Sequence, residues 1–255
     1  MAAVYVLAVR ASFERDGYVV VDDALSPQVV RSLRDHVAAA VDRRAADWLR
    51  TGRIRCAHAQ LPFEERYATL AAEAGEHVFK WGEILFGRAL YALVTAPGLV
   101  AALTDVLGPD VTFHGDQQLT PKFPGSAQTA FPWHQDTWYY GEPSKDLPIV
   151  TAWVPLVPAD ETNGCLWVLP GSHRWGLLPA TRGADRLVRC DEPVETRATP
   201  RPVPLTPGSV LLLTNLTFHA SAVNCSTTTR WSIDLGFSAP VAPSAPVATE
   251  RSARY

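Results

Sequence analysis

Hydrophobic residues recur at helical spacing through the first 110 positions of the chain. Apolar side chains three to four residues apart predict a long helix that begins at Pro27, with Ser26 as its N-terminal cap. The stretch before it, FERDGYVVVDDAL at 13–25, is expected to be extended. The expected helices cover residues 27–52, 63–93 with breaks near Gly75 and Gly82, and 97–108.

Beyond residue 110 the pattern changes to short extended runs that are separated by Pro, Gly, Asn and Asp. The expected strands cover residues 111–119, 149–157, 165–171, 209–216 and 230–237. Asn163 and Gly164 suit a tight hairpin turn between two of these segments. Many short strands without alternating helices favour a sandwich or jelly roll, mainly β, with the N-terminal helices on one outer face.

The composition fits one folded unit of this size. With 255 residues, 47% of them hydrophobic and 19% charged, the chain can bury a sizeable core and is not compositionally disordered. We expect a single domain over 1–238, helical to about residue 110 and with a jelly-roll core at about 111–238. The Pro/Ala-rich tail at 239–255 is expected to be loosely ordered.

Charge, hydropathy and cysteine spacing argue against several classes of protein. The net charge of −3, without a basic stripe, argues against a nucleic-acid partner. The sequence has no run of eighteen apolar residues, so no membrane span is predicted. Without an export signal or a CxxC pair, the cysteines predict reduced, buried thiols and a cytoplasmic protein; they are Cys56, Cys165, Cys190 and Cys225. The oligomeric state does not follow from the sequence.

A candidate metal site lies in the segment WHQD. On an extended strand, the spacing of His134 and Asp136 places both side chains on one face. His219, just after the apolar strand 209–216, offers a third ligand. Two histidines and one carboxylate on one face of a metal form the facial triad of non-haem Fe(II) oxygenases. Each residue alone is more often an ordinary surface or core group, so the prediction rests on their joint placement.

Arg230 is the candidate for binding an anionic ligand beside this triad. It follows His219 by eleven residues, and a hairpin between them would bring it back beside His219, inside the barrel. A guanidinium there would pair with a carboxylate of a small diacid, and Ser232 on the same strand face would donate its hydroxyl. The alternative is that Arg230 forms a plain structural ion pair.

Longer stretches of the chain resemble one family. The segments WHQD, WVPLVPADETNGCLWVLPGSHRWG and FHASAVNCSTTTRWS are similar to the phytanoyl-CoA dioxygenase family of Fe(II)- and 2-oxoglutarate-dependent oxygenases, from about Phe13 to Phe237. The Asn-Gly turn followed by PGSH, and the His-to-Arg spacing, are far more specific than the His-x-Asp pair. The resemblance implies a double-stranded β-helix, a cupin-like jelly roll with N-terminal helices.

The resemblance also implies roles for individual residues. Iron would be held by His134, Asp136 and His219, and Arg230 would bind the far carboxylate of 2-oxoglutarate. Further cosubstrate contacts are implied for Ser221, Ser232 and Trp153 and, more loosely, for Gln118 and Lys122. Halogenating relatives carry a small residue in place of the metal-binding carboxylate, so Asp136 argues against halogenation.

The function that this resemblance implies is oxygenation with Fe(II), 2-oxoglutarate and O₂, forming succinate and CO₂. The expected reaction is hydroxylation of a small organic substrate of the kind found in secondary metabolism. Two alternatives stay open. The same iron site could catalyse ring closure, desaturation or epimerisation, or the fold could serve as a jelly-roll binding protein without turnover, with a zinc enzyme as a weaker variant.

Aromatic residues follow the candidate metal site. Trp138, Tyr139 and Tyr140 would lie at the mouth of a jelly roll, where they would either form a wall for an organic substrate or pack against the helices. His114 and Phe131 are also expected to face the cavity.

Overall fold

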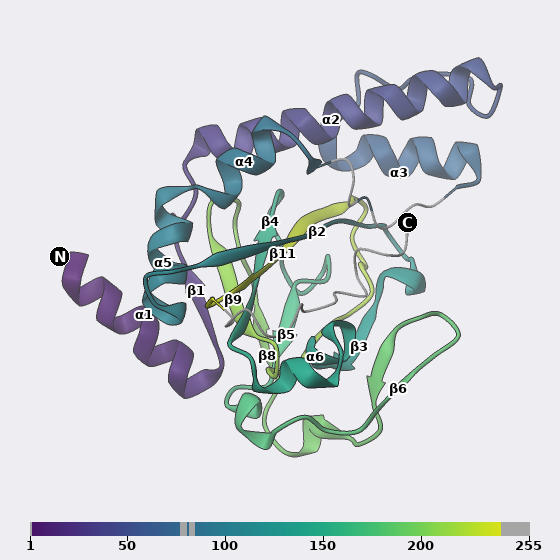
Figure 1. Ribbon diagram of the computed structural model, residues 1–255. Helices are drawn as coiled ribbons and strands as arrows, with labels where there is room; N and C mark the ends of the chain where they lie inside the picture. Colours follow the sequence, from purple (N-terminus) through teal and green to yellow (C-terminus); the bar gives the residue numbers. More distant parts are fainter. Residues whose placement is uncertain (1, 77–80, 82–84, 241–255) are drawn as a thin grey trace.

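The computed structural model describes residues 2–76, 81 and 85–240, with side chains from residue 9 onward. Figure 1 shows most of the helices gathered along one side of a β-sheet core. The helices are α1 (Ala2–Asp16), α2 (Pro27–Arg50), α3 (Phe63–Ala74), α4 (Arg88–Val94), α5 (Pro97–Leu107) and α6 (Thr137–Tyr140). The strands are β1 (Tyr18–Val21), β2 (Thr112–Lys122), β3 (Phe131–His134), β4 (Ile149–Pro155), β5 (Leu166–Val168), β6 (Ala180–Arg182), β7 (Val188–Cys190), β8 (Arg201–Val203), β9 (Val210–Thr214), β10 (His219–Ser221) and β11 (Arg230–Ser238).

Two antiparallel sheets form the core. The larger has the strand order β1-β9-β4-β11-β2, the smaller has the order β3-β10-β5-β8, and β6 and β7 form a separate two-stranded ribbon. Trp153 and Leu211 of the large sheet pack against Leu166 and Val168 of the small sheet in one hydrophobic cluster. The two sheets therefore face each other, and the predicted jelly roll with N-terminal helices is confirmed.

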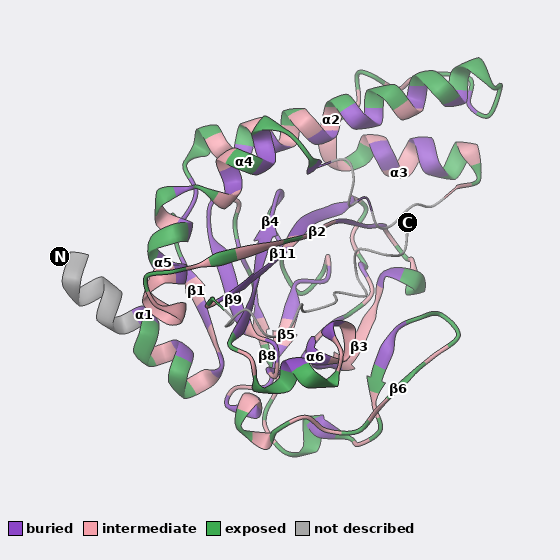
Figure 2. Cartoon of the chain, viewed as in Figure 1, coloured by how far each residue is buried: buried purple, intermediate pink, exposed green. Residues whose placement is uncertain are grey.

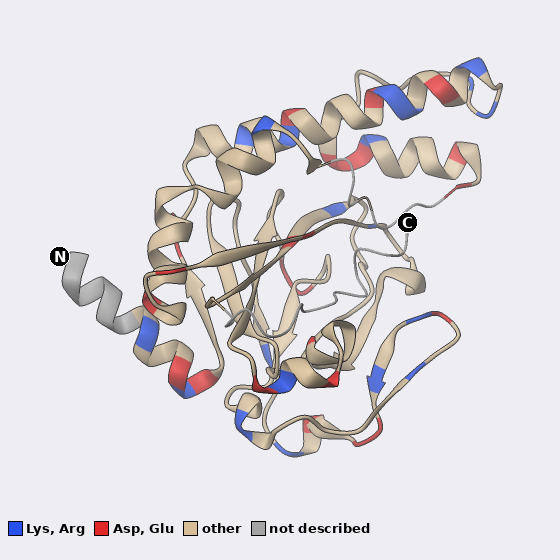
Figure 3. Cartoon of the chain, viewed as in Figure 1, with Lys and Arg blue, Asp and Glu red and all other residues tan. Residues whose placement is uncertain are grey.

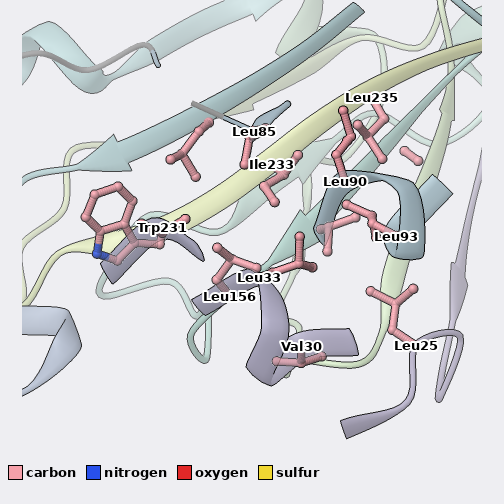
Figure 4. Packing of buried hydrophobic residues seen from close by; sticks show 14 of the residues in the cluster. Leu25, Val30, Leu33, Leu85, Leu90, Leu93, Leu156, Trp231, Ile233 and Leu235 are labelled. Atoms are coloured by element: carbon pink, nitrogen blue, oxygen red, sulfur yellow. The ribbon is translucent and has the colours of Figure 1, made fainter. Parts of the chain in front are cut away.

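The outer face of the large sheet is covered by the helices. Alternate residues of β11, including Trp231 and Ile233, point away from the barrel and join a cluster with Leu33 of α2 and Leu90 and Leu93 of α4. Figure 4 shows these side chains interdigitating, and Figure 2 shows the buried faces meeting between helices and sheet. Each fully buried large side chain contributes roughly 1.5–3 kcal/mol, so this layer fixes the large sheet firmly.

The expected helices at 27–52 and 97–108 are confirmed as α2 and α5. The expected helical region 63–93 is confirmed only at its two ends, as α3 and as α4 from Arg88 onward, because the described residues 75–76, 81 and 85–87 are not α-helical. The Ser26 hydroxyl accepts a 3.3 Å hydrogen bond from the Val29 N–H, and Pro27 opens α2. The helix α3 ends at Gly75, whose φ of 65° is left-handed, as the expected break requires. The expected break near Gly82 and the tail beyond residue 240 lie outside the described residues.

The expected extended segment at 13–25 is wrong in its first part. Residues 13–16 continue α1, and only Tyr18–Val21 is a strand. Val9 and Phe13 lie one helical turn apart and both enter the hydrophobic core, and α1 packs against α5, so tertiary packing favours helix here. Gly17, with φ of 80°, then ends the helix.

The Asn163-Gly164 turn exists, but it does not close a hairpin. The strands on either side, β4 and β5, belong to different sheets, so the turn carries the chain across the barrel. Asp160 Oδ1 accepts hydrogen bonds from the N–H groups of Thr162 and Asn163, and Asn163 Nδ2 donates to the Pro158 carbonyl. These side-chain bonds take the place of a strand ladder.

All four cysteines are free, as expected, but their burial differs from the prediction. Cys165 is buried and Cys190 is half-buried, whereas Cys56 and Cys225 are exposed. Both exposed thiols lie in loops that leave them in solvent. Among the described helices no single one has the length and apolar character of a membrane span, and only the bent pair α4–α5 passes such a test when taken together.

Candidate functional site

Three potential metal ligands meet at the junction of β3, β10 and α6. His134 and His219 are opposed on neighbouring antiparallel strands, with ring centroids 4.2 Å apart. Oδ1 of Asp136 lies 3.9 Å from His134 Nε2 and 3.8 Å from His219 Nε2. One ligand atom from each residue falls within 4.8 Å of the others, and all three residues are buried. The structure thus brings the predicted triad together.

Hydrogen bonds fix the direction in which these ligands point. Nδ1 of His134 lies 2.7 Å from the Pro132 carbonyl, and Nδ1 of His219 lies 3.0 Å from the Thr217 carbonyl. A carbonyl accepts only, so in each neutral ring Nδ1 carries the proton and Nε2 presents its lone pair toward Asp136. Two imidazole nitrogens and one carboxylate oxygen with such supporting bonds fit a first-row divalent metal such as Fe(II).

Asp136 reaches this position by a different route from the one expected. The strand β3 ends at His134, and Asp136 has helical φ and ψ of −62° and −26° at the start of α6. The buried Gln135 holds the turn between them: its Nε2 donates to the Gly176 and Leu216 carbonyls, each at 2.8 Å, and its Oε1 accepts from the Leu178 N–H. A turn held by Gln135, and not strand alternation, makes the two ligands converge.

Arg230 lies on the opposite wall of the same cavity, at the start of β11. It is buried, its Nη1 donates to Ser232 Oγ, and its guanidinium carbon lies 5.2 Å from the Trp153 ring centroid. Burial lowers the pKa of Arg230 to about 10, so the group stays charged at neutral pH. Its Nε has no hydrogen-bond partner among the described residues, which suits an anionic ligand.

The expected hairpin from His219 to Arg230 is wrong. The strands β10 and β11 belong to opposite sheets, and the connection crosses the barrel between them. Asn224 braces this crossing, because its Nδ2 donates to the carbonyls of Lys122 and Thr228 at 2.8 and 2.7 Å. His219 and Arg230 nevertheless face the same cavity, from opposite walls.

The cavity is small, about 80 Å³, and is partly open to solvent. Besides the triad and Arg230, it is lined by six residues that the sequence singled out: Gln118, Phe131, Tyr139, Trp153, Ser221 and Ser232. It is also lined by Thr120, Leu166 and Asp234, which no sequence motif indicated. The only indication in the sequence that these three face the cavity is that every second residue of a strand points to the same face.

Lys122 is close to the cavity without lining it. It is fully buried opposite Arg230 on the neighbouring strand, and its Nζ donates to the Thr129 carbonyl. Burial, with the nearby charge of Arg230, lowers the pKa of Lys122 to about 6. The amine is therefore largely neutral at neutral pH, and its side chain lies on the same inner face of the sheet as that of Arg230, 5.8 Å from the Phe131 ring centroid.

Two of the residues expected to face substrate lie elsewhere. Trp138 is half-buried outside the cavity, and its Nε1 donates to the Leu178 carbonyl at 3.0 Å. His114 packs edge-on against Tyr140, with centroids 6.2 Å apart, and does not line the cavity. Tyr139 does form a wall, with its ring 5.5 Å from that of His134 and its hydroxyl accepting from the Val188 N–H.

Comparison with known proteins agrees with this geometry. The family model described as phytanoyl-CoA dioxygenase (PhyH) matches residues 13–232. An ectoine dioxygenase of Nocardia farcinica is 30% identical over 166 residues, covering 64% of this chain and 50% of that protein. The 1-deoxypentalenic acid 11-beta-hydroxylase of Streptomyces arenae is 36% identical over 115 residues, covering 42% and 40%. The chain thus spans about half the length, or less, of these curated relatives.

Solved structures show the same fold at low sequence identity. The non-heme alpha ketoglutarate dependent epimerase SnoN matches with a TM-score of 0.63 at 20% identity, covering 97% of this chain and 88% of its own. EctD from S. alaskensis, solved with 2-oxoglutarate and 5-hydroxyectoine, matches with a TM-score of 0.63 at 23% identity, covering 90% and 74%. Since the family model covers most of the sequence, the chain belongs to the phytanoyl-CoA dioxygenase family.

Proposed function

We propose that this protein is a non-haem Fe(II)- and 2-oxoglutarate-dependent dioxygenase that hydroxylates a small organic molecule. The observation that carries the proposal is the joint placement of a buried His-Asp-His triad and a buried arginine on opposite walls of one cavity. A metal-binding jelly roll without a diacid cosubstrate would not need Arg230 at this position. A binding protein without turnover would need neither the triad nor Arg230.

Different residues of the site would hold the metal and the cosubstrate. His134, Asp136 and His219 would hold Fe(II) and leave the remaining positions to ligands. Arg230 would bind the distal carboxylate of 2-oxoglutarate, with Ser232 as its hydrogen-bond partner. When bound, the metal and cosubstrate supply the activation of O₂, in which 2-oxoglutarate becomes succinate and CO₂.

The surrounding side chains orient the ligands and exclude water. Trp153 packs beside the Arg230 guanidinium and limits its freedom to the direction of the cavity. Ser221 is buried beside His219 on β10, and its hydroxyl donates to the Gly164 carbonyl at 2.9 Å, leaving its lone pairs to accept. Phe131, Tyr139 and Leu166 supply apolar surface for an organic substrate.

The first test is an anaerobic titration of the purified protein with Fe(II) and then 2-oxoglutarate. We expect the visible charge-transfer band of an iron–2-oxoglutarate chelate, its loss in Asp136→Ala, and its retention in Asp35→Ala, which removes an exposed carboxylate from α2. Arg230→Ala should form the band only at a much higher 2-oxoglutarate concentration. A folded, iron-loaded protein without the band would contradict the proposal.

The product identifies the outcome once a substrate is found. Hydroxylation adds one oxygen to the mass of the substrate, ring closure or desaturation removes two hydrogens, and epimerisation leaves the mass unchanged. Mass spectrometry of the product, together with succinate formed per substrate consumed, therefore separates the proposed hydroxylation from the alternatives at the same site.

A further inference from the structure

Asp234 interrupts an otherwise buried strand. Of the nine residues of β11, eight are buried and Asp234 alone is half-buried. Its side chain shares the inward face with Arg230 and Ser232, because all three lie at alternate positions of one strand. Asp234 lines the same cavity as the triad, so its exposure is to the interior of that cavity.

The neighbours of Asp234 form a small recognition surface on the large sheet. In the strand register Asp234 lies opposite Gln118 of β2 on one side and Trp153 of β4 on the other, and both also line the cavity. A carboxylate is thus set between an amide and an indole ring, within the part of the cavity wall that faces the triad. Figure 3 shows how unusual a charge is here, because the strands of the two main sheets carry few charged residues compared with the helices.

The formal charges of the loaded site indicate a role for the Asp234 carboxylate in substrate binding. With cosubstrate bound, the charges of Fe(II) and Arg230 balance those of Asp136 and the two carboxylates of 2-oxoglutarate. Asp234 then adds a negative charge to a partly enclosed cavity, where the interaction between charges is stronger than in water. A substrate that brings a positive charge makes the loaded site neutral, whereas an anionic substrate meets repulsion.

We propose that Asp234 selects substrates that carry a protonated basic nitrogen, such as a primary amine or an amidine, and holds this group beside the metal site. This inference rests on the proposed function and names its substrate class. The indole of Trp153 supplies a face for the same cation, and Phe131 and Tyr139 contact the apolar part of the molecule. Asp234 is in this sense a specificity-determining residue that contacts substrate.

A structural role for Asp234 leads to a different expectation. Its negative charge raises the pKa of Arg230, against the larger effect of burial, so Asp234 is close enough to act as a counter-ion to the guanidinium. If its whole role were to hold that guanidinium in position, Asp234→Asn would leave Arg230 less well oriented and would weaken the binding of 2-oxoglutarate. As a substrate-recognising residue, Asp234 instead repels the dianion slightly, so Asp234→Asn should bind 2-oxoglutarate equally well or more tightly.

The test compares two probes of nearly equal shape, benzylammonium and benzyl alcohol. Wild-type protein is loaded anaerobically with Fe(II) and 2-oxoglutarate until the charge-transfer band forms, and each probe is titrated at constant ionic strength by calorimetry. We expect benzylammonium to bind about tenfold more tightly than benzyl alcohol, or more, since a charge-assisted hydrogen bond replaces a neutral one. Asp234→Asn should bring this ratio close to one, and Asp35→Asn, which removes an exposed charge from α2, should preserve it.

The outcomes separate the two proposals. A band in wild-type protein without preference for benzylammonium, whether both probes bind equally or neither binds, would overturn the inference and leave the proposed function standing. The same holds if Asp234→Asn keeps the preference or needs more 2-oxoglutarate to form the band. Absence of the band in folded, iron-loaded wild-type protein would overturn the proposed function and the inference together.

Discussion

The hydroxyl of Thr151 on β4 donates a 2.6 Å hydrogen bond to Oδ2 of Asp136, which ties the large sheet to the turn that carries two of the proposed metal ligands. Because Oδ2 is engaged by Thr151, Oδ1 is the oxygen that faces Nε2 of both histidines. Both partners are buried, so a bond to water would not compensate for loss of this hydrogen bond. Thr151 therefore determines which carboxylate oxygen is offered to a metal ion.

Thr151→Val removes this bond while keeping the shape of the side chain. We expect Fe(II) to bind about 10- to 100-fold more weakly, the usual effect of losing a hydrogen bond to a metal ligand. Anaerobic Fe(II) titration measures the change, and Thr151→Ser, which keeps a hydroxyl, should restore most of the affinity. Equal Fe(II) affinity in wild-type and Thr151→Val protein would show that the bond does not orient Asp136.

Gln135→Met should destabilise the fold through the turn between His134 and Asp136. The substitution leaves the Gly176 and Leu216 carbonyls and the Leu178 N–H without their partner, at about 1–3 kcal/mol for each buried group. We expect a loss of about 3 kcal/mol or more in the free energy of unfolding, measured by urea denaturation without metal. Gln128→Met changes an exposed glutamine and should stay within about 0.5 kcal/mol of wild type. Similar unfolding curves for the two variants would exclude this role of Gln135.

Gly164→Ala should lower the free energy of unfolding through a steric clash, and comparison with Gly52→Ala separates this clash from backbone strain. Gly164 has φ of 83°, and an added Cβ would come within 2.8 Å of the Ala222 carbonyl oxygen and closer still to Lys122 Cε. Gly52 has φ of 71° with open space around it, so Gly52→Ala measures backbone strain alone. We expect Gly164→Ala to lose about 1–3 kcal/mol more than Gly52→Ala in urea denaturation. Equal losses would mean that the neighbours of Gly164 yield without cost.

Local patterns predicted the parts of the fold that local interactions determine. The helix at Pro27 follows from Ser26 and from apolar spacing, and the buried strand β11 follows from its alternation and length. The pairing of His134 with His219 rests on a family resemblance more than on periodicity. The strand β10 that carries His219 has only three residues, too few for a period to be recognised.

The features that sequence reasoning missed depend on contacts between distant parts of the chain. The turn at Gln135 is held by groups 41 to 81 residues further along the sequence. Both expected hairpins, at Gly164 and before Arg230, proved to be crossings between sheets, because strand partners are set by the barrel and not by the intervening turn. Asp234 was missed for a similar reason: its alternation with Arg230 and Ser232 indicates an inward side chain, but only the assembled cavity shows that this position is open to a ligand.

Lys122 predicts an unusual dependence of stability on pH. Burial lowers its pKa from the ordinary lysine value of 10.5 to about 6 in the folded protein, so between these values the unfolded chain binds a proton that the folded chain does not. The free energy of unfolding should therefore rise with pH through this window, with a contribution from Lys122 of at most about 1.4 kcal/mol per pH unit. Below pH 6 the amine is protonated in both states, and its contribution levels off.

Lys122→Met tests this contribution, since every other titrating group is retained. Urea denaturation at pH 6, 7, 8 and 9 should show the variant gaining stability relative to wild type as the pH falls, because only wild type must then bury an amine that solvent would protonate. Loss of the hydrogen bond from Nζ to the Thr129 carbonyl changes the free energy of unfolding by an amount that does not vary with pH. The test is therefore how the difference between the two proteins changes with pH, and not its absolute size. Parallel curves for the two proteins would mean that Lys122 keeps its proton in the folded state, which would require an anionic partner close to its amine.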